Sequence, residues 1–411
     1  MSAQSPNKKP PDWQETVSLR DWQREALEKW RQNCRGIVKV VTGAGKTIFA
    51  QQCMRVFHEK YPSGKSIIIV PTVALLDQWV VSLLEDLNVS ESEIACFSGE
   101  DKAAGLNRVN VFVINTARKI VQYIKPEDET FLIVDECHRA GSLMNSLALK
   151  APHKATLGLS ATPERNFDEG FEKHLVPSLG EIIFTYDYAA AYRDKVIVPF
   201  ELINVRVEML PKEEEQYRKL TKRAAREFHR LQKEGGADDK LKRILMKRAT
   251  VSATATMRIP VTAAIVDQNK GKRALVFHER IDAADRLLNI LVTRKHSATI
   301  YHTGVGPIIR RDNLRLYRRG MFDVLVSCRA LDEGTNVPET LVAVIASSTS
   351  SQRQRIQRLG RVLRPANGKV VAVVYTLYAT DLEEKRLKEE EGSLEGVAKV
   401  SWYRGKANLH G

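Results

Sequence analysis

The chain has 411 residues, of which 43% are hydrophobic and 28% are charged. That composition excludes wholesale disorder, and the length predicts about two or three domains, with two as the starting hypothesis. Lys and Arg outnumber Asp and Glu by 64 to 50, a net charge of +14, which favours a polyanionic partner and makes nucleic acid the leading candidate.

The N-terminal residues 1–15 are polar and contain several prolines, so we expect a short flexible tail there. They include no apolar core of signal-peptide length, and no later segment approaches the about 18 consecutive apolar residues of a membrane span. The five cysteines are scattered, odd in number and never in a C-x-x-C pair, which indicates neither a disulfide framework nor a zinc ribbon. We therefore expect a cytoplasmic protein with no membrane contact.

Short apolar runs alternate with helix-like stretches in two parts of the chain. GIVKVV at 36–41 and FLIVD at 131–135 are typical of the first series, and RALVFH at 273–278 and LVAVIA at 341–346 of the second. Uninterrupted hydrophobicity of this kind is typical of parallel strands buried on both faces. The sequence therefore predicts an α/β protein with two doubly wound parallel-sheet domains, at 16–200 and 269–411.

The segment between these domains, residues 201–268, is predicted to be a linker with a basic helical insert. From Pro211 onwards it has no strand signal, and its two helix-like stretches are separated by Gly235 and Gly236. Lys222 to Arg248 contains ten basic and four acidic residues. Two interpretations stay open: a solvated pair of charged helices, or a projection that contacts nucleic-acid phosphates through Lys222, Arg223, Arg226 and Arg230.

The strongest chemical motif is VVTGAGKT at 40–47, which follows a predicted strand and precedes a predicted helix. Glycines at these positions let backbone N–H groups approach phosphate oxygens, and the lysine reaches the β- and γ-phosphates while the final hydroxyl binds Mg²⁺. ATP and Mg²⁺ are therefore the predicted cofactors. The predicted binding residues are Thr42, Gly43, Ala44, Gly45, Lys46 and Thr47.

The segment VDECHRAG at 134–141 allows three chemistries: a metal site, a Cys-His nucleophile, or a pair of carboxylates for magnesium and water. The metal site needs further ligands at recognisable spacing, and the other Cys and His residues provide none. A nucleophile normally takes its base from elsewhere in the fold, not from the next residue. With a phosphate loop upstream, we favour Asp135 as the Mg²⁺ carboxylate and Glu136 as the base that activates water.

The form of these two motifs resembles motifs I and II of superfamily 2 helicases, with Val40 in place of the usual alanine and DECH in the DExH group. The resemblance covers Leu19 to Pro365. It implies two tandem RecA-like domains, with nucleotide in the cleft between them and nucleic acid across the opposite top face. It also implies that His138 couples the nucleotide state to the second domain.

Other segments of the first domain resemble further motifs of the same family, in the family's order. LRDWQREAL resembles the Q-motif, which implies adenine recognition by Gln23 with support from Arg20, although an ordinary amphipathic helix is the alternative. VPTVALLDQW and INTARKI resemble motifs Ia and Ib, and LSATPER resembles motif III. The resemblance assigns phosphate contacts, or helix caps as the alternative, to Pro71, Thr72 and Thr116, and coupling to Ser160 and Thr162.

The second domain contains CRALDEGTNVPE and QRIQRLGRVLRP, which resemble motifs V and VI. Where the family usually has Gly-x-Asp, this chain has Gly334 and Asn336, which are implied to contact the nucleotide ribose. Gln357, Arg361 and Arg364 are implied catalytic residues. The two arginines would stabilise charge on the transferring γ-phosphate.

Within superfamily 2, phrases such as LRDWQ and LGLSATPER most resemble type III restriction motor subunits and XPB-like repair translocases. The resemblance implies an ATP-dependent motor on duplex or forked DNA, with RNA as the less favoured substrate. An ATP-gated DNA-binding switch that recruits a separate nuclease is the second interpretation, because the motifs specify ATP coupling and not strand separation. The predicted partners are DNA and a possible nuclease, repair or phage-defence subunit.

Overall fold

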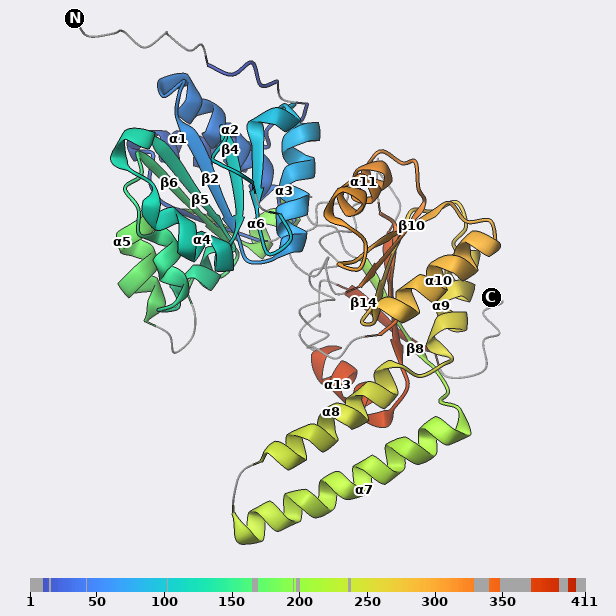
Figure 1. Ribbon diagram of the computed structural model, residues 1–411. Helices are drawn as coiled ribbons and strands as arrows, with labels where there is room; N and C mark the ends of the chain where they lie inside the picture. The colour runs from blue at the N-terminus through green and yellow to red at the C-terminus, as the bar shows by residue number, and fades with distance from the viewer. Residues whose placement is uncertain are drawn as a thin grey trace, which may run out of the picture. The chain divides into compact units, whose positions relative to one another are not determined.

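The computed structural model describes residues 10–14, 16–41, 43–101, 103–164, 169–194, 196, 200–235, 238–328, 340–347, 371–391 and 398–403. These residues divide into two compact units, one within 10–196 and the other within 200–403 (Figure 1). Each unit contains one parallel sheet with helices around it. The predicted fold class, two tandem doubly wound RecA-like domains, is confirmed.

The first domain is built on a seven-stranded sheet with the strand order β3-β4-β2-β5-β6-β1-β7. All of its pairings are parallel. Parallel neighbours place the carboxyl ends of their strands at one edge, where the connecting loops gather functional groups. The strands are β1 (Ile37–Val40), β2 (Lys65–Val70), β3 (Ile94–Phe97), β4 (Val109–Val113), β5 (Thr130–Asp135), β6 (Ala155–Ser160) and β7 (Ile182–Tyr186).

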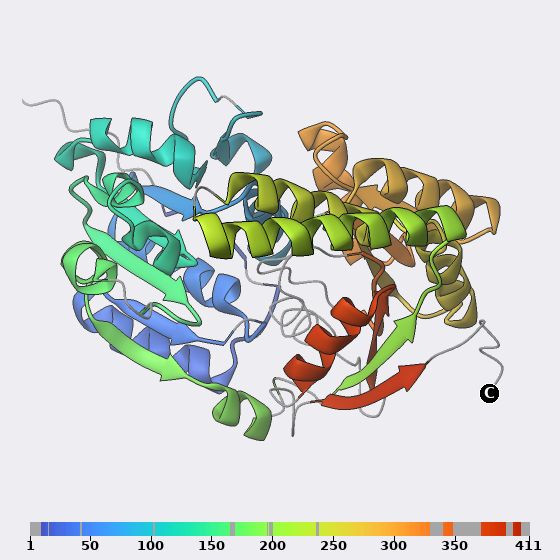
Figure 2. The same ribbon diagram turned by 90° about the horizontal axis from the view of Figure 1, so that it is seen from below.

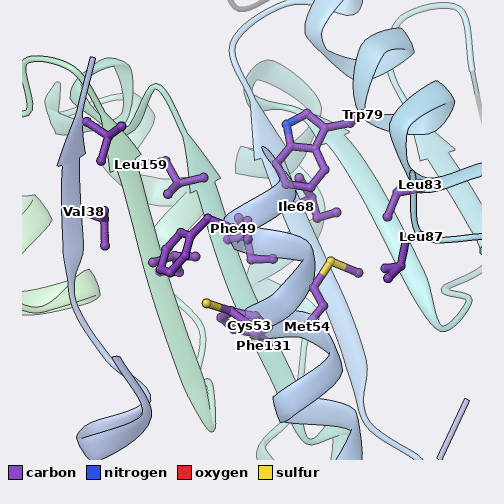
Figure 3. Packing of buried hydrophobic residues seen from close by; sticks show 14 of the residues in the cluster. Val38, Phe49, Cys53, Met54, Ile68, Trp79, Leu83, Leu87, Phe131 and Leu159 are labelled. Carbon is purple, nitrogen blue, oxygen red and sulfur yellow. The ribbon is translucent and has the colours of Figure 1, made fainter. Parts of the chain in front are cut away.

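Apolar cores lie on both faces of this sheet, which explains the uninterrupted hydrophobicity of its strands. Ile68 and Val70 of β2 belong to one buried cluster, whereas the intervening Ile67 and Ile69 belong to another. Figure 3 shows the first cluster, where Phe49 and Met54 lie among strand residues. The helices are α1 (Asp21–Asn33), α2 (Lys46–Lys60), α3 (Val73–Asp86), α4 (Ile114–Ile120), α5 (Val176–Leu179) and α6 (Tyr188–Arg193), with short turns η1 (Glu91–Glu93), η2 (Val121–Tyr123), η3 (Pro126–Asp128), η4 (Cys137–Gly141), η5 (Asn145–Leu149) and η6 (Phe171–Leu175).

The second domain repeats the same topology in a second seven-stranded sheet, with the order β10-β11-β9-β12-β13-β8-β14. Each strand takes the place of the strand seven numbers earlier in the first sheet, so β8 corresponds to β1 and β12 to β5. Its pairings are again parallel. The strands are β8 (Phe200–Arg206), β9 (Ala274–His278), β10 (Ala298–Tyr301), β11 (Val324–Cys328), β12 (Val342–Ile345), β13 (Ala372–Tyr378) and β14 (Ala398–Tyr403).

A long helical hairpin is the main addition to the second domain. Helices α7 (Pro211–Glu234) and α8 (Asp239–Ala253) lie side by side and project away from the sheet of their own domain (Figures 1 and 2). Among its described residues, the buried apolar contact consists of Leu220, Ala224 and Ile244. The remaining helices are α9 (Arg258–Gln268), α10 (Ile281–Thr293), α11 (Pro307–Arg318) and α13 (Asp381–Glu391).

The structure differs from the predicted linker at 201–268 in two places. The segment begins within β8, which pairs with β13 and β14, and it ends with α9, whose Ile265 and Val266 lie in the core of the second domain. Strand β8, like β3, β7 and β14, is not among the strands that the sequence predicts, and all four lie at or next to an edge of their sheet. Partly exposed strands alternate in polarity and are too short to show a clear periodic signal.

The predicted flexible tail also differs from the structure. Trp13 is 5% exposed, packs edge-on against His58, and donates a hydrogen bond from Nε1 to Glu93 Oε2 at 3.2 Å. A tryptophan buries a large apolar surface, so even a polar and proline-bearing segment is held in place around it. The first domain therefore begins at least three residues before the expected boundary at residue 16.

In the described part of the chain, no single helix is both long enough and apolar enough to cross a membrane. Helices α8 and α9 together reach the required length and composition across a bend of 41°. The apolar residues of α9 pack in the core of the second domain.

Candidate active site

The phosphate loop follows β1 and ends at the N-terminus of α2, as the sequence predicts. Gly43 and Gly45 have φ angles of 84° and 102°, in the left-handed region that favours glycine. Gly45 has a second constraint, because a Cβ atom there would lie 2.9 Å from Gln23 Nε2. The backbone N–H groups of the loop therefore lie at the N-terminus of α2, a helix of fifteen residues, which is a suitable position for an anion.

Three side chains of the α1 segment hold this loop through its carbonyl groups. Gln23 Nε2 donates to the Gly45 carbonyl at 2.8 Å, and both Trp22 Nε1 and Arg20 Nη1 donate to the Ala44 carbonyl at 3.3 Å. Gln23 Oε1 also accepts the Arg20 backbone N–H at 2.7 Å. The structure thus places the predicted adenine-binding residues Arg20 and Gln23 beside the phosphate loop, and adenine recognition by Gln23 stays a prediction.

Lys46 and the two acidic residues of the DECH segment come together at the carboxyl edge of the sheet. Lys46 Nζ lies 3.2 Å from Glu136 Oε1 and 3.4 Å from the Val40 carbonyl. All three charged side chains are buried, with exposed fractions of 7% for Lys46, 6% for Asp135 and 8% for Glu136. Charged groups are buried in this number only where partners or ligands compensate them, so the cluster is a candidate functional site.

The backbone at Glu136 is strained. Its φ of 48° lies in the left-handed region, which costs a residue with a side chain free energy. This conformation ends β5 abruptly and lets successive side chains point to different partners. Asp135 accepts hydrogen bonds from Trp79, while Glu136 faces Lys46.

The electrostatics of this pair suit a divalent cation. Burial raises the pKa of Asp135, and the neighbouring charge of Glu136 raises it further. Two carboxylates against one ammonium leave an excess of negative charge, and carboxylate and hydroxyl oxygens are the ligands that Mg²⁺ prefers. Asp135 and Thr47 therefore fit the predicted magnesium site by their chemistry.

The residues predicted to couple nucleotide to the rest of the molecule also meet. His138 Nδ1 lies 3.0 Å from Ser160 Oγ and 3.4 Å from Glu136 Oε2, and Ser160 Oγ accepts the Thr162 backbone N–H at 3.1 Å. Strands β5 and β6 are neighbours in the sheet, so motifs that are distant in sequence become adjacent. The geometry thus joins the DECH segment to the SAT segment.

The thiol of the DECH segment takes no part in this cluster. Cys137 is fully buried in an apolar cluster, and burial raises the pKa of its thiol. A thiol held neutral in an apolar core is a poor nucleophile and a poor metal ligand. Among the described residues, no three His, Cys, Asp or Glu side chains are placed together to hold a metal.

The predicted nucleic-acid contacts of the first domain lie at the ends of two adjacent strands. Pro71 and Thr72 follow β2, Thr116 lies just after β4, and these strands pair directly. Thr72 is the N-cap of α3, where its Oγ1 accepts the Leu75 backbone N–H at 3.3 Å. The capping role suggested as the alternative is thus present for Thr72, and phosphate contact stays a prediction for all three.

The basic residues of the hairpin differ among themselves. Arg230 is held by Glu227 at 2.6 Å and by Glu234 at 3.3 Å, and Glu227 also binds Lys240 at 2.7 Å. Lys222, Arg223 and Arg226 are exposed, and no ion pair to another described residue occupies them. Three of the four predicted contacts are thus available to a polyanion, whereas Arg230 is engaged within the hairpin.

Several predicted site residues lie outside the described residues, so their positions stay predictions. They belong to the phosphate loop and to the segments that resemble motifs V and VI: Thr42, Gly334, Asn336, Gln357, Arg361 and Arg364.

Two residues that shape the site were not predicted, namely Trp22 and Trp79. Each donates its indole N–H into the site, to the Ala44 carbonyl at 3.3 Å and to Asp135 Oδ2 at 2.9 Å respectively. Trp22 lies in LRDWQREAL and Trp79 in VPTVALLDQW, and the resemblance of these segments to family motifs assigns neither tryptophan a role. A tryptophan on an apolar helix face is usually core, and only a three-dimensional contact distinguishes the two that also donate to a site.

Comparison with known proteins places these features in a family. A family model described as "Type III restriction enzyme, res subunit" matches residues 16–165, and "Helicase conserved C-terminal domain" matches 257–366, together more than half of the chain. The chain is 27% identical to "DNA 3'-5' translocase XPB2" of Sulfurisphaera tokodaii, over 91% of this chain and 85% of that protein. It is 26% identical to "DNA 3'-5' helicase XPB" of Mycobacterium tuberculosis, over 90% of this chain but only 62% of that longer protein.

A solved structure supports the fold independently. "S. cerevisiae Dbp5 bound to RNA and ADP BeF3" aligns with a TM-score of 0.63, covering 93% of this chain and 89% of that chain at 14% identity. At this identity the likeness concerns the fold alone. The likeness therefore supports the same fold for this chain.

Proposed function

Because the chain belongs to the superfamily 2 helicases and translocases, in the group of type III restriction subunits and XPB-like proteins, we propose that it is an ATP-driven DNA motor. The observation that carries the proposal is the buried cluster of Lys46, Asp135 and Glu136 beside the phosphate loop. A protein that only bound DNA would not need two buried carboxylates and a lysine at the end of a glycine loop.

Each residue of the cluster has a defined part in the proposed hydrolysis. The Lys46 ammonium leaves Glu136 and binds the β- and γ-phosphates of ATP, which frees the Glu136 carboxylate to accept a proton from the attacking water. Asp135 and Thr47 would hold Mg²⁺, which would supply neutralisation of phosphate charge. The resemblance further assigns stabilisation of the γ-phosphate to Arg361 and Arg364, with Gln357, and ribose contact to Gly334 and Asn336, all of which lie outside the described residues.

DNA is the proposed polymer. The relatives that match over most of this chain are named as DNA translocases and helicases. The net charge of +14 and the exposed cations of the hairpin favour binding to a phosphate backbone, which gives grip without sequence selection. In the first domain, Thr72 and Thr116, which follow the carboxyl ends of β2 and β4, would also contact the DNA backbone.

The test is the ATPase rate measured in parallel without polymer and with single-stranded DNA, duplex DNA, forked DNA and RNA. We expect strong stimulation by DNA and weak stimulation by RNA. Equal rates in all five reactions would overturn the motor proposal. Displacement of a triplex-forming strand, measured alongside, distinguishes movement along DNA from ATP-gated binding that serves a separate nuclease.

A further inference from the structure

The carboxylate of Asp135 is held by the protein at both of its oxygen atoms. Oδ1 accepts the Glu136 backbone N–H at 3.0 Å, and Oδ2 accepts the indole N–H of Trp79 at 2.9 Å. The side chain is 6% exposed, so water provides little of its solvation. The orientation of the carboxylate is therefore set by these two donors.

The two donors differ in what fixes them. The Glu136 N–H belongs to the same turn of chain as Asp135, and it moves with that turn. Trp79 comes from α3, an element separated from Asp135 by 56 residues of sequence. Its N–H therefore holds the carboxylate from a different element of the fold.

The Trp79 ring is packed within the core of the first domain. The residue is 1% exposed and belongs to the same apolar cluster as Leu83, one turn further along α3, and Leu87, which follows the end of that helix (Figure 3). A tryptophan has a single polar atom, and a buried N–H without an acceptor would cost free energy. The ring and the carboxylate therefore hold each other in one arrangement.

We propose that Trp79 is a positioning residue for the magnesium site, because its indole N–H fixes the rotamer of Asp135 in the orientation that binds the metal. The proposal rests on the proposed role of Asp135 as a Mg²⁺ carboxylate. Partners of this kind orient the groups that bind a metal and govern metal affinity without touching the metal. Trp79 thus acts through Asp135 and not on ATP itself.

The test uses the full chain and the binding of a fluorescent ATP analogue, mant-ATP, titrated with Mg²⁺. Trp79→Phe removes the N–H and keeps an aromatic ring. We expect it to raise the Mg²⁺ concentration for half-maximal binding by roughly tenfold. Binding of mant-ATP without Mg²⁺ should stay at the wild-type level, because Lys46 and the phosphate loop are untouched.

Trp30→Phe is the matched control. Trp30 is fully buried in the same domain, and its Nε1 donates to the Thr156 carbonyl at 2.9 Å, away from the carboxylates. It loses the same kind of hydrogen bond, so a general loss of packing would affect both variants alike. We expect the Mg²⁺ titration of Trp30→Phe to match wild type.

A double-mutant cycle with Asp135→Asn separates positioning from packing. If Trp79 acts through the carboxylate, Trp79→Phe has no further effect on mant-ATP binding once Asp135 is replaced. Equal loss in both backgrounds, or an unchanged Mg²⁺ titration in Trp79→Phe, would overturn the inference. Should Trp79→Phe fail to show a thermal unfolding transition, Trp79→Leu, which also lacks the N–H donor, is measured in its place, with a raised Mg²⁺ requirement expected and a wild-type one overturning the inference.

The same Mg²⁺ titrations distinguish a wrong role for Asp135 from a wrong role for Trp79. If wild-type protein binds mant-ATP with no dependence on Mg²⁺, the magnesium role of Asp135 is wrong. If wild-type binding depends on Mg²⁺ and Trp79→Phe behaves the same, only the role of Trp79 is wrong.

Discussion

Strands β1 and β8 take the same place in their two sheets, yet the chain that follows them differs completely. After β1, a short glycine loop leads at once into α2, with its N–H groups at the helix N-terminus. After β8, the chain instead forms the α7 and α8 hairpin before it returns through α9. One topology thus offers the same position for two devices, and we propose that one binds the phosphates of ATP and the other those of DNA.

The buried cations near these positions show the same contrast. Arg258, at the start of α9, is 1% exposed and uses its guanidinium to bind the carbonyls of Ser252, Ala346 and Leu377 and both oxygens of Glu383, at 2.8 to 3.0 Å. Among the described residues, Lys46 in the first domain has two longer contacts, at 3.2 and 3.4 Å. A buried cation that donates short hydrogen bonds through all of its nitrogen atoms has a structural role. A cation with few and longer hydrogen bonds can exchange them for contacts with a ligand.

The largest expected effect concerns the first domain. Glu136→Gln should lower ATP turnover by roughly 100-fold or more, because it removes the base and keeps the side-chain shape. Lys46→Ala should instead weaken nucleotide binding, since it removes the charge that meets the phosphates. Steady-state ATPase rates and mant-ATP binding, measured on both variants, separate the two effects. Wild-type turnover by Glu136→Gln would show that the DECH assignment is wrong.

The next effect tests the structural cation of the second domain. Arg258→Met should destabilise the protein by about 3–5 kcal/mol, because it leaves buried carbonyls unpaired and breaks a buried ion pair. Lys46→Met is the matched variant in the first domain, and it should lower the free energy of unfolding less while abolishing nucleotide binding. Urea unfolding of both variants gives the comparison. Equal losses of stability would remove the distinction between the two cations.

These pairs also show what the sequence could and could not predict. The phosphate loop, Asp135 and Glu136 were predicted because each lies within a few residues of a strand end, so local pattern is enough. The contact between Trp79 and Asp135 and the one between Arg258 and Glu383 join segments 56 and 125 residues apart, which no local pattern reveals. Strand β8 was missed because its burial alternates, as in a half-exposed strand, although it lies one place from the sheet edge.

A smaller effect is expected at the hairpin, where structure refines the predicted set of cations. Reversing Lys222, Arg223 and Arg226 to Glu should weaken duplex binding and lower the slope of log affinity against log salt by about 0.9 for each lost phosphate contact. ATP hydrolysis without polymer should stay unchanged, because these three exposed side chains belong neither to the phosphate loop nor to the cluster of Lys46, Asp135 and Glu136. Fluorescence anisotropy of a labelled duplex over a series of salt concentrations measures both quantities.

Arg230→Gln is the control for this hairpin experiment. Since Arg230 already binds Glu227 and Glu234, its loss should leave the salt slope close to wild type. If the triple variant bound duplex DNA as wild type does at both low and high salt, the hairpin would be only a solvated pair of helices.

The last effect concerns the acid sensitivity of the first domain and appears only as the pH falls below neutrality. Burial lowers the pKa of His58 to about 3 and that of His153 to about 4 in the first domain, and it lowers the pKa of His278 to about 4 in the second. His58 Nε2 lies 3.0 Å from Ser66 Oγ, within the core. A folded-state pKa below the ordinary value of about 6.5 means that the unfolded chain binds the proton more readily, so stability is present above that value and is lost as pH falls towards 3. For His58 alone the loss should approach about 1.4 kcal/mol for each pH unit in that range.

His58→Gln, which keeps a hydrogen-bonding group for Ser66 and does not titrate, should flatten this part of the profile, as measured by urea unfolding from pH 7 to pH 4. His229→Gln, on the exposed face of α7, is the control and should leave the profile as in wild type. Identical pH profiles for wild type and His58→Gln would show that protonation of this buried imidazole does not govern the acid stability of the first domain.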